Sequence, residues 1–183
     1  MLNIRKRSAA IGMSAALTAS LIVVPISVSQ AIPCKPTKAT GKTVGRIVAG
    51  GVNMPIKAFN YPAGGVMEPQ PTTLAAGVSK RHMPLNSQLG TSVITWHVNY
   101  NGCWNKLNIF MSKKVGYKFK VTDEDGVTRT YRIEKKLKVK KGKYQESWFT
   151  LVSPRKLTLV TCTGSFIKGH YTHNMVFIAS PVV

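Results

Sequence analysis

The sequence has very little negative charge. Its 183 residues include six Asp and Glu against 26 Lys and Arg, which gives a formal net charge of +20. A balance this one-sided favours anionic surroundings, such as nucleic acid, anionic lipid or acidic cell-wall polymers. Ten lysines lie between Lys113 and Lys143, and we interpret this stripe as a surface attracted to an anionic cell envelope. The alternative is a solvated face that only keeps the protein soluble.

Charge of either sign is absent between Ser8 and Ala31, directly after three basic residues at positions 5–7. This pattern predicts an export signal. Because roughly 20 apolar residues can span a bilayer, residues 1–31 are either a cleaved signal peptide or a retained membrane anchor. Both alternatives place the rest of the chain on the extracellular face of the membrane or in the cell wall. Export therefore argues against a nucleic-acid partner.

Helical periodicity is also scarce, with a turn or two expected at most between Lys106 and Ser112. Alternating apolar and polar residues on both sides of Asp125-Gly126 predict a β-hairpin. In this hairpin region, the lysines at 118, 120, 138 and 140 fall on the face opposite the apolar side chains. Further buried strands are expected at Ser92–Trp96, Leu157–Thr161 and Met175–Ala179. Seven or eight strands in all predict an all-β sandwich or closed barrel.

No internal repeat divides the chain, and its length suits one domain behind the export segment. Residues 32–51 are rich in Lys, Thr and Gly and show no apolar period, which is typical of a linker. We therefore expect one folded domain over residues 52–183.

Cysteine is scarce too, and the three cysteines are an odd number, so at least one lies outside any intramolecular disulfide. Cys162 ends an apolar strand just before a loop that contains Gly164. The strand would hold the backbone of Cys162 rigidly, and the loop would leave its thiol accessible to a substrate. A thiol attacks as a thiolate, so it needs a base or a positive charge nearby. His97 also ends an apolar strand and is the candidate partner. Taken alone, a strand cysteine is more often inert packing, and such a histidine more often structural.

The segment Leu157-Thr-Leu-Val-Thr-Cys162 resembles the sortase signature, in which the catalytic cysteine ends a strand with the sequence TLxTC. The similarity extends to the histidine about 65 residues upstream, to the Tyr117–Val121 strand and to the final strand ending at Ala179. It covers roughly residues 55–183. Order and spacing are similar to the actinobacterial branch called class F.

This resemblance implies an eight-stranded β-barrel and a monomeric cysteine transpeptidase that needs no metal or cofactor. Cys162 would cleave an LPXTG-like C-terminal sorting motif of an exported protein and hold the product as a thioester. His97 would protonate the leaving amine. An amine of a cell-wall precursor or a pilin would then release the product. Loops at 62–70 and 134–148 would flank the substrate groove.

Two positions depart from the family pattern. The family has an arginine early in the strand after the cysteine, whereas this chain has Asn174 there and no arginine after Arg155. Asn174 is either a working oxyanion donor or a sign of a decayed enzyme, which would leave a noncatalytic cationic module that binds envelope polymers. Lys168, His170 and His173 are alternative sources of charge. Trp96 replaces a common glycine and either narrows the groove or packs beneath it.

The two remaining cysteines leave one choice open. Pairing of Cys34 with Cys103 would tie the linker across the active-site end of the barrel. We favour the alternative, which is two reduced thiols or a loss of order around Cys34 near the N-terminus that signal cleavage would create.

Overall fold

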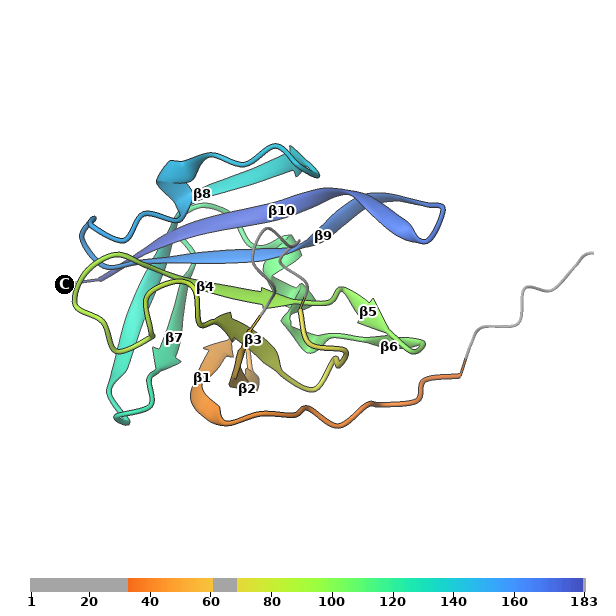
Figure 1. Ribbon diagram of the computed structural model, residues 1–183, viewed down its shortest axis with the longest axis horizontal. Helices are drawn as coiled ribbons and strands as arrows, with labels where there is room; N and C mark the ends of the chain where they lie inside the picture. The colour runs from red at the N-terminus through yellow and green to blue at the C-terminus, as the bar shows by residue number, and fades with distance from the viewer. Residues whose placement is uncertain (1–32, 61–68, 183) are drawn as a thin grey trace, which may run out of the picture. The chain divides into compact units, whose positions relative to one another are not determined.

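A computed structural model describes residues 33–60 and 69–182 (Figure 1). Eight strands close into a barrel in the order β1-β2-β3-β4-β9-β10-β8-β7, and β5 and β6 form a small separate sheet. This confirms the eight-stranded barrel. The barrel strands are β1 (Thr43–Ala49), β2 (Val52–Phe59), β3 (Ala76–Ser79), β4 (Thr91–Trp96), β7 (Lys118–Thr122), β8 (Thr128–Lys140), β9 (Lys156–Ile167) and β10 (His170–Pro181).

The other elements are short. The strands β5 (Asn99–Tyr100) and β6 (Cys103–Trp104) pair as a hairpin after β4. The 3-10 helix η1 spans Lys106–Ser112, where the sequence predicted a turn or two, and η2 spans Glu146–Trp148. Within residues 33–60 and 69–182, no helix has the length and apolar character needed to cross a membrane.

Alternation along each strand separates the barrel interior from its outer face. On β9, Leu157 and Leu159 belong to the main core, whereas Val160 packs in a second cluster with Val93, Val176 and Trp148. Trp148 comes from η2, so the loop between β8 and β9 covers part of the outer face of the sheet. The two clusters hold β4, β9 and β10 rigidly side by side.

The hairpin expected around Asp125-Gly126 is present, since β7 and β8 pair antiparallel on both sides of it. The four predicted surface lysines at 118, 120, 138 and 140 are all exposed. The barrel, however, begins earlier than the sequence indicated. Strand β1 lies inside the range 32–51 that was expected to be a linker, because Ile47 and Ala49 alternate into the core.

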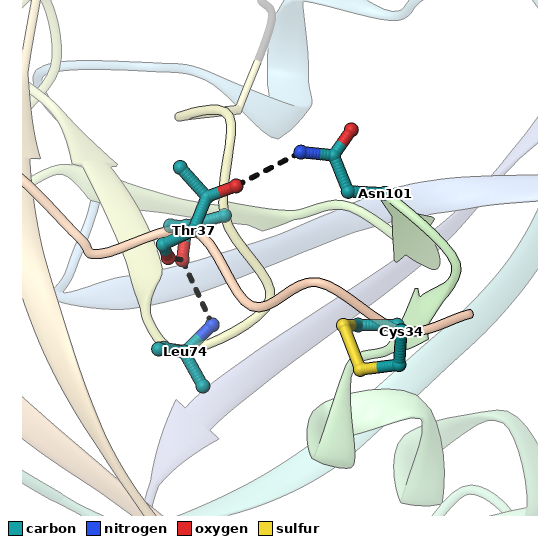
Figure 2. Close-up of a disulfide and its surroundings, with 6 residues drawn as sticks. Cys34, Thr37, Leu74 and Asn101 are labelled. Atoms are coloured by element: carbon teal, nitrogen blue, oxygen red, sulfur yellow. Dashed lines mark hydrogen bonds between the residues drawn. A yellow bond between two sulfur atoms is a disulfide. The ribbon is translucent and has the colours of Figure 1, made fainter.

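The prediction that Cys34 and Cys103 remain reduced is wrong, because the two form a disulfide (Figure 2). The segment before β1 is hydrogen-bonded to the loop between β5 and β6. The backbone N–H of Lys35 donates to the carbonyl of Asn101, and the side-chain amide of Asn101 donates to Thr37 Oγ1 over 3.0 Å. These bonds bring Cys34 to β6, where the disulfide closes.

Candidate active site

Cys162 lies on the outer face of β9, one alternation beyond Val160. The prediction that Cys162 ends its strand is wrong, because β9 continues through Gly164 to Ile167 as it pairs with β10 beyond the core. Leu157 to Thr161 are buried, whereas Cys162 is partly exposed and lies outside the disulfide. The buried part of the strand fixes the backbone, and the partial exposure leaves the sulfur accessible. A nucleophilic thiol needs both conditions.

The strand register brings Cys162, His97 and Asn174 into one row across three neighbouring strands. Parallel pairing of β4 with β9 sets Trp96 opposite Thr161, so His97 follows at the level of Cys162. Thr161 Oγ1 donates to the Trp96 carbonyl over 2.8 Å and ties the two strand ends together. On the other side, antiparallel pairing sets Asn174 directly opposite Cys162. Directly paired residues in such a sheet have Cβ atoms about 5 Å apart.

His97 is held from two sides. Its ring lies 5.3 Å from the ring of Tyr100, and its Nε2 lies 3.1 Å from the carbonyl oxygen of Pro69. A carbonyl can only accept, so Nε2 carries the hydrogen in this bond. The other ring nitrogen, Nδ1, is then the atom that gains and loses a proton as the imidazole changes charge.

Asn174 is 6% exposed and donates from Nδ2 to the hydroxyl oxygen of Tyr144 over 2.7 Å. An amide nitrogen carries two hydrogens, so this bond uses one of two donors. The bond fixes the orientation of the side-chain amide beside Cys162. An amide fixed in this way can donate to an oxyanion without having to reorganise.

Tyr144 was not singled out in the sequence, although the predicted groove loop at 134–148 contains it. Partial burial raises the pKa of its hydroxyl above the ordinary value; the hydrogen bond from Asn174 opposes this, and the charge of a Cys162 thiolate adds to it. Tyr144 therefore stays protonated at neutral pH and lies close to Cys162. The signal in the sequence was only an aromatic residue after Gly142-Lys143.

Lys168, His170 and His173 do not join the row. Lys168 forms the turn between β9 and β10, with a φ of 48°, and His170 is exposed beside it. His173 is the neighbour of Asn174 along β10, so its side chain points to the opposite face of the sheet. Its Nδ1 lies 2.8 Å from Thr172 Oγ1. Of these three residues and Asn174, only Asn174 faces Cys162.

Trp96 packs beneath the row and does not narrow a groove. Its side chain is fully buried in the barrel core, where its ring lies 5.8 Å from that of Phe110. The indole N–H donates to Asn108 Oδ1 over 3.1 Å. Of the two possibilities for this residue, the structure supports packing.

Parts of both predicted groove loops contact the row. Residues 62–68 of the first loop lie outside the described residues, but Pro69 holds His97. The second loop begins only after Lys140, because β8 continues through residues 134–140. A hollow of about 290 Å³ lies against it, next to the row, and is lined by Leu137, Val139, Lys143, Tyr144, Gln145 and Trp148. Among the described residues, no group of three or more His, Cys, Asp or Glu side chains could hold a metal ion.

Replacing Tyr144 with phenylalanine is expected to lower the turnover of the peptide cleavage that the resemblance implies by about fivefold, because one hydrogen bond contributes roughly 1 kcal/mol. The loss should fall on kcat rather than KM, because phenylalanine keeps the ring that lines the hollow and loses only the hydroxyl that orients Asn174. In an Asn174→Ala background the same substitution should have no further effect. Tyr171→Phe, which removes a hydroxyl that contacts Asn99 instead, is the matched control. Equal losses in both backgrounds would contradict the positioning role.

Comparisons with known proteins identify the family of the chain. The model of the Sortase domain matches residues 46–182. A pilus-related sortase C of Group B Streptococcus is similar in structure, with a TM-score of 0.60 and 20% identity over 79% of this chain and 70% of that chain. Sortase A from Corynebacterium diphtheriae gives a TM-score of 0.60 and 18% identity over 80% and 63% of the two chains. Sortase C1 from Streptococcus suis gives a TM-score of 0.58 and 17% identity over 78% of this chain and 74% of that chain.

No curated protein matches the sequence. At these identities the solved structures establish the fold alone, and the class F subclass stays a prediction. The domain match is of a different kind, since it spans most of the chain and contains Cys162, His97 and Asn174. The chain therefore belongs to the sortase family of cysteine transpeptidases.

Proposed function

We propose that this protein cleaves an LPXTG-like sorting motif in exported proteins and transfers them to an amine of a cell-wall precursor or a pilin. The row of Cys162, His97 and Asn174 across β4, β9 and β10 carries this proposal. In this proposal Cys162 is the nucleophile, His97 the proton carrier and Asn174 the amide donor. The strand register supports these roles, because the three positions adjoin on one face of the sheet. The exported location predicted from residues 1–31 supplies both substrates.

In the first half-reaction, the Cys162 thiol gives its proton to His97 and the sulfur attacks the carbonyl carbon before the scissile Thr-Gly bond. The carbonyl oxygen becomes an oxyanion, to which the Asn174 amide donates. When the intermediate collapses, the C–N bond breaks and His97 returns the proton to the leaving amine. The product is a thioester on Cys162.

In the second half-reaction, the acceptor amine attacks the thioester carbonyl, again through an oxyanion beside Asn174. Loss of the amine proton to His97 and departure of the sulfur complete the new amide bond. The hollow beside Tyr144 has an apolar floor from Leu137, Val139 and Trp148, which suits an apolar side chain of the bound peptide. It supports a peptide substrate that lies along the outer face of the sheet.

The alternative is a sortase fold that has lost activity and only binds anionic envelope polymers, as the missing arginine suggested. Cleavage of a mixed library of sorting peptides distinguishes the two functions. We expect wild type to cleave a subset of the library and Cys162→Ala to cleave none. A wild type no more active than the alanine variant would support the binding module instead.

A further inference from the structure

Two hairpins extend beyond the barrel at the end where β9 leaves the core (Figure 1). One is the far half of β9 and β10, paired up to Ile167 and His170. The other is the β5–β6 hairpin, and the two are joined where the Tyr171 hydroxyl donates to Asn99 Oδ1 over 3.4 Å. We call this region the hairpin end. It lies outside the barrel core and beside the row of candidate catalytic residues.

Large apolar side chains are exposed on both hairpins of this end. Trp104 is 68% exposed on β6, and Phe166 and Ile167 are 64% and 56% exposed on β9. The other two tryptophans of the chain, Trp96 and Trp148, are buried. A tryptophan exposed at the same end of the domain as two more large apolar side chains indicates a surface that is covered in use.

The hairpin end is also purely basic. The two hairpins, together with the adjoining row and the segment before β1, lie within residues 33–40, 97–106 and 162–174, which contain no Asp or Glu. They carry four exposed lysines, at positions 35, 38, 106 and 168. These exposed apolar side chains, with lysines around them, fit a partner surface that has an anionic outer layer over an apolar interior. An anionic lipid bilayer has this layering, with lipid phosphates over acyl chains.

The disulfide fixes where the chain enters the domain. Cys34 is bonded to Cys103, the residue before Trp104, and the uncharged run that predicts an export segment ends three residues earlier, at Ala31. The N-terminal segment therefore joins the domain at the same end as the exposed apolar side chains. If that segment is held in a bilayer, the hairpin end is the part of the domain closest to it along the chain.

We propose that the hairpin end is a membrane-docking surface that rests on an anionic bilayer, with Trp104, Phe166 and Ile167 at the level of the lipid headgroups. Tryptophan favours this depth because its ring is apolar and its N–H is polar. For the proposed transpeptidase, docking keeps Cys162 close to the membrane surface. Ile167 is five residues from Cys162, about 17 Å along a strand. Peptide substrates whose carriers are still held in the bilayer would reach the row there.

The test uses the full chain in vesicles that contain phosphatidylglycerol and a lipid brominated near the headgroup. Residues 1–31 contain no tryptophan, so quenching by bromine reports on the domain and not on the export segment. With Trp96 and Trp148 buried in the domain, we expect bromolipid quenching that is lost in Trp104→Phe. Phe166→Ser with Ile167→Ser should also reduce it, as should replacing phosphatidylglycerol with a zwitterionic lipid.

The matched control is Leu151→Ser with Val152→Ser. These two side chains are exposed as well, but they lie before the other end of β9 and should leave the quenching unchanged. The proposal would be overturned if Trp104 stays unquenched by bromolipid and is quenched by aqueous acrylamide in vesicles. It would also be overturned if Trp104 is shielded from both quenchers, because protein and not lipid would then cover it. Cleavage of a soluble peptide in detergent should be the same for the docking variants and wild type. Failure of docking is thereby distinguished from failure of the proposed reaction.

Discussion

Replacing His97 with glutamine is expected to lower kcat/KM for sorting-peptide cleavage by about 10² to 10⁴, the range that general acid–base catalysis contributes. Glutamine can still donate to the Pro69 carbonyl, so the local structure should persist. It cannot take a proton from Cys162 or return one to the leaving amine. The loss should therefore be chemical, with an unchanged melting temperature.

The matched control for this substitution is His170→Gln. His170 is exposed at the turn between β9 and β10 and does not face Cys162. The His170→Gln variant should cleave a soluble peptide at the wild-type rate. A His97→Gln variant that also keeps the wild-type rate would remove His97 from the mechanism and leave the thiol without its proposed proton carrier.

Asn174→Ala is expected to reduce turnover by about 10² to 10³, as loss of one oxyanion donor does in other acyl-transfer enzymes. The geometry supports this size of effect, because Asn174 is buried opposite Cys162 and its amide is oriented by Tyr144. Asn86→Ala removes an exposed amide that donates to Asp125 and serves as the matched control. It should leave the rate unchanged.

Asn174→Arg separates a working donor from a relic of the family arginine. In a working site, the longer charged group must displace the contact with Tyr144 and should not exceed wild type. In a relic, wild type would be inactive, Asn174→Ala would change nothing, and Asn174→Arg would restore part of the rate. The second pattern would contradict the proposed transpeptidase reaction and leave only the sortase fold.

The sequence predicted an all-β sandwich or barrel because the strands carry their own signals, and the resemblance to sortases selected the barrel. The Asp125-Gly126 turn between alternating runs fixes β7 and β8, and the apolar run before Cys162 fixes β9. Strand β1 was missed because its seven residues follow a Lys- and Gly-rich stretch that masks the alternation. In this case the partner strands β2 and β7, and not the local pattern, define the strand.

The candidate site was predictable to the extent that it follows the ends of buried apolar runs. Cys162 and His97 each end a buried run, and parallel pairing of two such runs brings their ends together. Tyr144 and the disulfide were not predictable in this way. Both depend on how a segment without periodicity folds back, over 30 residues from Tyr144 to Asn174 and 69 residues from Cys34 to Cys103. Local sequence carries little information about such contacts.

The thioester on Cys162 is the central claim, and intact-mass measurement tests it most directly. Wild type is mixed with a sorting-peptide library in the absence of any amine acceptor, quenched in acid and weighed, and then digested to locate any adduct. We predict an added mass equal to the N-terminal part of the cleaved peptide, located on Cys162 and released by hydroxylamine. Peptide cleavage without an adduct on Cys162, or the same adduct in Cys162→Ala, would contradict the mechanism.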